Sequence, residues 1–303
     1  MMNILKKIIY KMLSLFGLCF SKKVIIIKCD SPLDEENSIA IKSKFGFWYV
    51  GKITDTSDIV YGIANNGLIE EGETNLVKKI LEYLTSDKDI VFYDIGANTG
   101  YYGILSAYLG AGKIKVFSFE PVKEHFITLQ KNIKINDLGE IVKPFELALG
   151  KEVEELEINL SGSGSSLDSD FNGNVILPKR KVQVTKMDVL FKENLIEKPD
   201  FIKMDVEGFE LNILEGGKEL ISKETPIIFV EIADKISDRD YVNKNYKKTI
   251  DFFFNLEYRV FCVEGEKIID VKDGYEFDGV RMFLCLNVKK HDKIINYLKL
   301  YEQ

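Results

Sequence analysis

The stretch Val91-Phe-Tyr-Asp-Ile-Gly-Ala-Asn-Thr-Gly100 decides the fold of this chain. The apolar run Ile90–Tyr93 predicts a buried strand, and Tyr101–Leu109 predicts a helix directly after the glycines. Gly96 permits a tight turn, and Gly100 permits a close approach of helix and strand. Strand, glycine turn and helix in this order are typical of an open α/β sheet that binds a ligand through backbone N–H groups.

Two carboxylates near this turn indicate what the ligand is. Asp94 stands at the end of the first strand, and Glu120 follows a second predicted strand, about 20 residues after the turn, where a carboxylate accepts hydrogen bonds from ribose hydroxyls. The dinucleotide pattern Gly-x-Gly-x-x-Gly is absent, because Asn98 stands where the second glycine would meet a pyrophosphate. The motif therefore favours a smaller nucleoside with a cationic group near Asp94.

Further carboxylates end the later strands. Asp205 and Glu207 alternate after the strand Phe201–Met204, and Glu231 ends the next one. Because like charges are costly to bury, a rim of this kind needs a cationic sulfonium, a metal or Lys203 to compensate it. The predicted rim consists of Asp94, Glu120, Asp205, Glu207 and Glu231.

These motifs resemble those of the FkbM family of S-adenosylmethionine-dependent methyltransferases. The resemblance runs from about Gly72 to Ile232 and rests on Asp94-x-Gly-x-Asn-x-Gly100, Phe119-Glu-Pro121 and the most family-specific segment, Ile202 to Gly217. It implies S-adenosylmethionine as the cofactor and a hydroxyl acceptor, often on a sugar or polyketide. The cofactor-binding residues that it implies are Asp94, Gly96, Asn98, Gly100 and, for the ribose, Glu120. Val184–Asp188 resembles a family strand that ends near an aspartate.

The rim also supplies candidate catalytic residues. An alcohol acceptor gains from a general base, for which Glu207 and Glu231 are the candidates. We expect Asp205 near the transferred methyl group and Lys203 beside a developing alkoxide. The alternative is that Asp205 or Glu207 caps the helix that starts near Gly208. No dedicated metal pattern is present, although oxygen ligands would suit Mg²⁺.

Strands and helices alternate along the rest of the chain, which predicts a doubly wound, mostly parallel, seven-stranded α/β sheet. As the resemblance implies, only the last strand is antiparallel. The predicted strands are Ile90–Tyr93, Ile114–Phe119, Val142–Leu149, Phe201–Met204, Ile227–Glu231, Tyr258–Val263 and Met282–Leu286. The predicted helices are Tyr101–Leu109, Val122–Ile135, Phe209–Ser222 and Val242–Asn255. Glu154–Leu160 and Arg180–Thr185 predict a β-hairpin, and Ser161–Ser166 is either a lid over the site or a solvent loop.

The start of the chain predicts separate parts. Residues 1–23 have apolar side chains at helical spacing and lysines elsewhere on the wheel, which predicts a basic amphipathic helix. Three interpretations are open for this helix: peripheral membrane contact, packing on a partner or the core, and a secretion signal. Residues 24–71 form a small extension with strands at 24–29 and 38–50, and residues 72–303 form the methyltransferase domain.

Composition limits the class of protein. The 303 residues carry a net charge of -7, which argues against nucleic acid as a partner because phosphate binding needs a basic face. The four cysteines are scattered, which fits a reduced cytoplasmic location. His125 is expected on a helix surface and His291 in solvent, so a histidine base is disfavoured.

Three functions remain in competition. The leading one is an S-adenosylmethionine-dependent O-methyltransferase whose acceptor is a sugar, glycan or glycolipid precursor. The second is a nucleoside-binding module without catalysis that recruits partners through residues 1–23. The third is an NAD-dependent oxidoreductase, which Asn98 disfavours. The sequence names neither the acceptor nor an oligomeric state.

Overall fold

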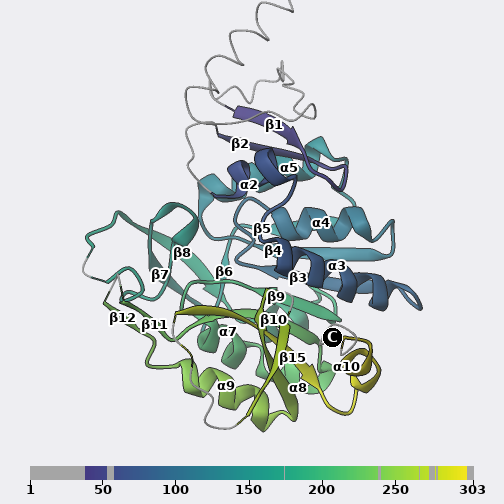
Figure 1. The fold of residues 1–303 in the computed structure, drawn as a ribbon. Helices are drawn as coiled ribbons and strands as arrows, with labels where there is room; N and C mark the ends of the chain where they lie inside the picture. The colour runs from purple at the N-terminus through teal and green to yellow at the C-terminus, as the bar shows by residue number, and fades with distance from the viewer. Residues whose placement is uncertain are drawn as a thin grey trace, which may run out of the picture.

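The structure, a computed structural model, describes residues 38–52, 58–173, 175–237, 240–265, 267–272, 277 and 279–298. The predicted N-terminal helix at 1–23 and the predicted strand at 24–29 lie outside these residues. An eight-stranded sheet of order β14-β13-β15-β10-β9-β3-β4-β5 forms the centre of the molecule (Figure 1). Its strands are β3 (Ile90–Ile95), β4 (Ile114–Phe119), β5 (Val142–Phe145), β9 (Phe201–Met204), β10 (Ile227–Ala233), β13 (Tyr258–Glu264), β14 (Lys267–Val271) and β15 (Val280–Asn287).

The sheet confirms the predicted α/β class. Strands β10, β9, β3, β4 and β5 pair in parallel, and β15 runs antiparallel between β10 and β13. The prediction missed β14, which forms an antiparallel hairpin with β13 and adds an eighth strand. The predicted strand Val142–Leu149 is wrong as one element. It is divided into β5, an edge strand that tolerates Pro144, and β6 (Ala148–Leu149), which belongs to another sheet.

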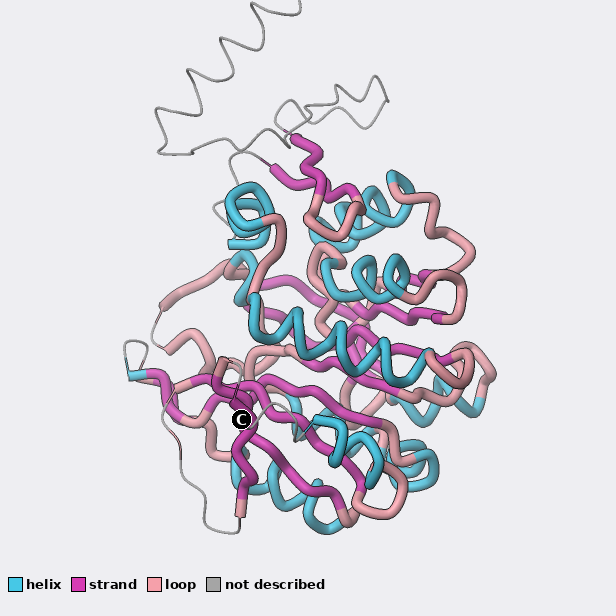
Figure 2. Tube along the Cα trace, turned by 45° about the vertical axis from the view of Figure 1, so that its right-hand side comes forward, coloured by secondary structure: helices cyan, strands magenta, loops and turns pink. Residues whose placement is uncertain are grey.

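Helices cover both faces of the sheet, as Figures 1 and 2 show. Side chains that alternate along β3 enter different cores: Phe92 packs in the core that α2, α3, α4, α5 and α10 share, and Tyr93 packs in the core of α6 to α9. Both faces are therefore buried, as expected of a doubly wound sheet. The helices are α2 (Asp58–Asn66), α3 (Glu71–Thr85), α4 (Tyr101–Leu109), α5 (Lys123–Ile135), α6 (Met187–Lys192), α7 (Glu210–Gly216), α8 (Lys218–Glu224), α9 (Tyr246–Asn255) and α10 (Asp292–Leu298).

The predicted helix Phe209–Ser222 is two helices, α7 and α8, that meet at Gly217. A Cβ atom at Gly216 would lie 1.9 Å from the carbonyl oxygen of Gly150, so the backbone of α7 touches the chain just after β6. None of the described helices is both long and apolar enough to cross a membrane.

The described part of the N-terminal extension is hydrogen-bonded to α5 and to the residue that follows this helix. Its strands β1 (Ser38–Lys42) and β2 (Trp48–Lys52) form an antiparallel hairpin. The Val50 N–H donates to Asn132 Oδ1 (2.6 Å), and the Trp48 N–H donates to Asn136 Oδ1 (2.7 Å). Tyr49 is buried in the same core as α3 and α4. The described part of the extension thus shares its core with the sheet.

A small three-stranded sheet of order β6-β8-β7 lies beside the large one (Figure 1). Strands β7 (Glu154–Asn159) and β8 (Lys179–Thr185) pair antiparallel, which confirms the predicted hairpin. A short 3₁₀ helix, η1 (Gly162–Gly164), lies in the connection between them. Strands β11 (Lys235–Ile236) and β12 (Tyr241–Val242) form a further short pair.

Candidate active site

A cavity lies at the carboxyl ends of β3, β4, β9 and β10, where open α/β sheets bind their ligands. Its wall brings together eight of the nine site residues predicted from the sequence: Asp94, Gly96, Asn98, Glu120, Lys203, Asp205, Glu207 and Glu231. Gly100 lies outside the wall. It has φ +93°, and a Cβ atom there would lie 2.3 Å from Leu129 of α5, so it allows a close approach between helices rather than between helix and strand.

Glu120 is held rigidly at the end of β4. Its Oε2 accepts the Asn98 N–H and its Oε1 accepts the Val122 N–H, each at 2.8 Å. Because a carboxylate oxygen has two lone pairs, each oxygen still has acceptor capacity for a ligand hydroxyl. His125 Nδ1 lies 3.7 Å from Glu120 Oε1 and the side chain lines the cavity, so the prediction of a surface position for His125 was wrong. That side chain faces inward because it belongs to the first turn after Glu120.

Asp94 and Gly96 shape the floor of the cavity. Asp94 is 1% exposed, and its Oδ2 accepts the Gly103 N–H (2.8 Å) in the first turn of α4. Burial raises the pKa of Asp94 to about 6, although the charge of Lys203 and the Gly103 hydrogen bond oppose the shift. A Cβ atom on Gly96, at φ +75°, would lie 1.8 Å from the Asp205 carbonyl oxygen. The turn after β3 therefore touches the end of β9, as only glycine allows.

An apolar wall completes the half of the cavity around Glu120, and motif reasoning did not find it. It is formed by Pro121, Val122, Leu147, Leu149 and Phe209. Ligand pockets commonly combine such a wall with a few placed polar groups. This half has the features that a nucleoside needs: an apolar surface for the base and a carboxylate for the ribose.

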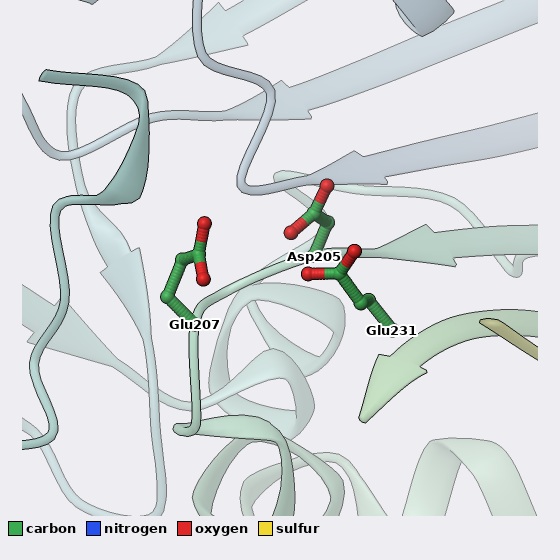
Figure 3. A group of neighbouring side chains, drawn as sticks. All are labelled: Asp205, Glu207 and Glu231. Carbon is green, nitrogen blue, oxygen red and sulfur yellow. The ribbon is translucent and has the colours of Figure 1, made fainter. Parts of the chain in front are cut away.

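The other half of the cavity is crowded with charge. Oxygen atoms of Asp205, Glu207 and Glu231 all lie within 4.8 Å of one another, and the three side chains point toward a common space (Figure 3). This spacing also fits oxygen ligands of a divalent cation, for which the sequence showed no dedicated pattern. Burial, followed by the charges of Asp205 and Glu207, raises the pKa of Glu231 well above its ordinary value and so favours its protonated form.

Lys203 is the cation within this group. Its side chain is 4% exposed, and Nζ lies 2.8 Å from Asp205 Oδ2. Burial alone would lower the pKa of Lys203, but the charges of Asp205, Glu70 and Asp94 raise it above its ordinary value. Lys203 therefore stays positively charged, and its ammonium group forms an ion pair with Asp205.

The start of the helix after β9 is stabilised by a residue of the helix itself, Glu210. Helix α7 begins at Glu210 without a side-chain cap, and the Gly208 N–H donates to Glu210 Oε1 (2.8 Å). Asp205 instead has its Oδ2 paired with Lys203 Nζ, which does not favour the capping interpretation for this carboxylate. The backbone of Glu207 is left-handed, with φ +56°, a conformation that costs a non-glycine residue energy.

Asp188, by contrast, has a structural role. Its Oδ1 accepts the Leu220 N–H (2.9 Å) and its Oδ2 accepts the Glu219 N–H (3.1 Å), at the start of α8. It lies in α6, past the end of β8, and is not among the residues that line the cavity.

The loop Ser161–Ser166 covers the charged half. Ser163 and Ser165 line the cavity, and Ser166 Oγ donates to the Glu207 carbonyl oxygen (2.5 Å). This arrangement favours the lid interpretation over that of a solvent loop.

Sequence reasoning left open that the N-terminal extension holds the acceptor pocket, but it named none of the residues before β3 that line the cavity. Ile59, Ile69 and Glu70 line the cavity, and so does Tyr102 of α4, whose hydroxyl donates to Glu70 Oε2 (2.6 Å). Glu70 belongs to no motif. The one available signal was Tyr102, a hydroxyl-bearing side chain in an apolar helix next to the glycine turn.

His291 was predicted in solvent, and this was wrong. It is 7% exposed and its Nδ1 accepts the Asn287 N–H (3.0 Å). Burial lowers the pKa of His291 to about 3, so it is neutral at physiological pH. It is remote from the cavity wall and has a structural role.

Comparison with known proteins identifies the family of the chain. The family model described as the methyltransferase FkbM domain matches residues 94–293. The 2-O-methyltransferase NoeI of Sinorhizobium fredii is 28% identical over 167 residues, which are 50% of this chain and 67% of that protein. The hexuronic acid methyltransferase AglP of Haloferax volcanii is 25% identical over 172 residues, 56% of this chain and 66% of that protein.

Two solved structures are also similar in fold. An FkbM methyltransferase from Methylobacillus flagellatus KT has a TM-score of 0.43 and 17% identity, covering 64% of this chain and 43% of its own. An S-adenosylmethionine-dependent O-methyltransferase from Thermotoga maritima has a TM-score of 0.39 and 11% identity, covering 82% of this chain and 77% of its own. Since the family match spans more than half of the 303 residues, the chain belongs to the FkbM methyltransferase family.

Proposed function

We propose that the protein is an S-adenosylmethionine-dependent O-methyltransferase that acts on a hydroxyl group of a sugar, glycan or glycolipid precursor. The observation that carries the proposal is one cavity with two unlike halves. Glu120 and the apolar wall suit the nucleoside, and the charged half beside them suits the reacting groups. The relatives named 2-O-methyltransferase and hexuronic acid methyltransferase support a sugar acceptor.

The residues fit the cofactor by their chemistry. Glu120 has free acceptor capacity for ribose hydroxyls, and Asp94 and Asp205 provide negative charge for a cationic group. When bound, S-adenosylmethionine supplies a methyl group on a positively charged sulfur. The protein's contribution is to align the acceptor and to remove its proton, because a neutral hydroxyl is a weak nucleophile.

Glu207 is the proposed general base. Glu231 is a poorer candidate because burial and the charges of Asp205 and Glu207 raise its pKa and favour the protonated form, which cannot accept a proton. Lys203, held by Asp205, places a fixed positive charge next to the carboxylates, where negative charge would develop on the acceptor oxygen.

Transfer of the methyl group to sugars tests the proposal directly. The purified chain is incubated with S-adenosylmethionine and a panel of simple glycosides, and S-adenosylhomocysteine is quantified together with the methylated product. We expect product only when both substrates are present. Tight cofactor binding without methylation of any hydroxyl acceptor would instead favour the nucleoside-binding module. Binding of NADH with no binding of S-adenosylmethionine would favour the oxidoreductase.

A further inference from the structure

The acceptor half of the cavity has a wall that the family domain does not supply. Ile59, Ile69 and Glu70 precede residue 94, where the family match begins, yet all three line the cavity together with Lys203 and Glu207. A sugar that reaches Glu207 therefore meets side chains of the N-terminal extension. This wall therefore comes from residues outside the matched family domain.

Glu70 is the polar member of that wall, and it is held in place. Its Oε2 accepts the Tyr102 hydroxyl (2.6 Å), and its side chain also hydrogen-bonds Glu73. Burial and the charge of Glu70 raise the pKa of Glu73 to about 8, and burial raises the pKa of Tyr102 well above its ordinary value. The Tyr102 hydroxyl therefore keeps the proton that it donates to Glu70, and below about pH 8 the protonated form of Glu73 is favoured beside it.

The charge of the cavity limits what Glu70 can bind. Among the described residues, Lys203 is the one lining side chain with a permanent positive charge. It is occupied, since Nζ lies 2.8 Å from Asp205 Oδ2 and 4.6 Å from the centroid of the Tyr102 ring. The lining carboxylates outnumber it six to one: Glu70, Asp94, Glu120, Asp205, Glu207 and Glu231.

A negatively charged sugar would enter this cavity without a cation to meet it. A protonated Glu231 and a bound sulfonium would each reduce the excess of negative charge, but carboxylates would still outnumber cations. An ammonium group gains from the same surroundings, because a hydrogen bond between charged groups is stronger than a neutral one. Glu70 is itself an exposed residue beside the charged half, so a cation can reach it without displacing Lys203.

We propose that Glu70 is the specificity-determining residue for the acceptor, and that it selects a sugar bearing a protonated amino group over the neutral and the anionic sugar. This proposal rests on the proposed sugar O-methyltransferase function. It also contrasts with the relative named for hexuronic acid, an acidic sugar.

Three methyl glycosides that differ at one substituent provide the test: methyl glucosaminide, methyl glucoside and methyl glucuronide. The full chain is assayed with each under saturating S-adenosylmethionine and with EDTA present. We expect kcat/KM to be highest for the amino sugar and lowest for the uronide. Preference for the neutral or the acidic sugar would overturn the proposal, and so would equal use of the three.

Variants assign the preference to Glu70. Glu70→Gln keeps an oxygen for the Tyr102 hydroxyl but removes the charge, so KM for the amino sugar should rise about 10- to 100-fold with little change in kcat. The matched control is Glu71→Gln, because the neighbouring Glu71 side chain is 73% exposed and lies outside the cavity wall. It should leave all three acceptors unchanged. Unaltered selectivity in Glu70→Gln would overturn the assignment.

Binding separates failure of this proposal from failure of the proposed function. Saturation-transfer NMR of the same glycosides is recorded with S-adenosylhomocysteine present and needs no turnover. Preferential binding of the amino sugar, lost in Glu70→Gln, supports the role of Glu70 even where methyl transfer is absent. Methyl transfer without that preference supports the enzyme and overturns the role of Glu70, as does the absence of any binding.

Discussion

Glu120 directly follows β4 and Glu231 lies in the carboxyl-terminal half of β10, a parallel strand of the same sheet, but their carboxylates have opposite surroundings. Glu120 accepts two backbone N–H groups, from Asn98 and Val122, whose positions the chain itself determines. Glu231 faces the carboxylates of Asp205 and Glu207, and its pKa is raised by burial and by their charges. In the cofactor half, both oxygens of the Glu120 carboxylate therefore have a hydrogen-bond donor before any ligand binds. The carboxylates of the other half become better satisfied when a proton or a cation arrives.

The largest expected effect comes from the charged half. Glu207→Gln keeps the shape of the side chain but removes the proposed base, so turnover should fall by about 10²–10⁴-fold while folding and cofactor affinity survive. Glu231→Gln is the control: because burial and neighbouring charges favour the protonated form of Glu231, which a glutamine resembles, this variant should change turnover far less. The measurement is S-adenosylhomocysteine formation at saturating substrates. If Glu231→Gln loses the activity and Glu207→Gln keeps it, the roles are reversed.

Substitutions in the cofactor half should change the affinity for S-adenosylmethionine rather than the turnover rate. Glu120→Ala removes the acceptor of two backbone N–H groups and of the ribose hydroxyls, so S-adenosylmethionine binding should weaken by about 1.5–3 kcal/mol. Glu120→Gln, which keeps one acceptor oxygen, should lose less. Isothermal titration calorimetry gives both dissociation constants, and unchanged values would show that the nucleoside lies elsewhere.

Asp94 lies between Glu120 and Lys203, and we expect it to make the free energy of unfolding depend on pH. Its pKa rises to about 6 on folding, so the folded state holds the proton more tightly than the unfolded state. The stability due to that proton is full below about pH 4 and is lost as the pH rises through 6. Asp94→Asn removes the titration, so relative to the parent it should gain up to about 2–3 kcal/mol between pH 4 and pH 7.5.

Urea denaturation of parent and variant at both pH values measures this gain. Asp94→Asn should also bind S-adenosylmethionine more weakly, because the negative charge is gone. A difference in unfolding free energy that is the same at pH 4 and pH 7.5 would contradict the assigned cause of the shift.

The smallest effect is expected at Asp188, a carboxylate with a structural role alone. Asp188→Ala removes the acceptor of two N–H groups at the start of α8 and should cost about 1–2 kcal/mol of unfolding free energy. Its turnover at a temperature where the variant is folded should equal that of the parent. A loss of turnover in the folded Asp188→Ala variant would contradict a role of Asp188 in stability alone.

Much of the fold followed from local patterns. The segment Ile90–Leu109 predicted β3, the turn and α4 because apolar runs and glycines specify strand and turn locally. The break at Gly217 and the division of Val142–Leu149 were not predictable in this way. The break at Gly217 depends on Gly150 and Met187, which approach from other parts of the chain. The division of Val142–Leu149 depends on β8, with which β6 pairs in the small sheet.

The motifs predicted which residue types would line the site because the ends of parallel strands meet at one edge. Residue order alone determined that Asp94, Glu120, Asp205 and Glu231 would share that edge, since parallel pairing with crossover helices leaves no other arrangement. Only the tertiary structure decided their states: which carboxylate receives backbone N–H groups, and which has its pKa raised by burial and neighbouring charges. It also brought Glu70 and the inward-facing His125 to the cavity, because hydrogen bonds and burial depend on distances between segments that are far apart in sequence.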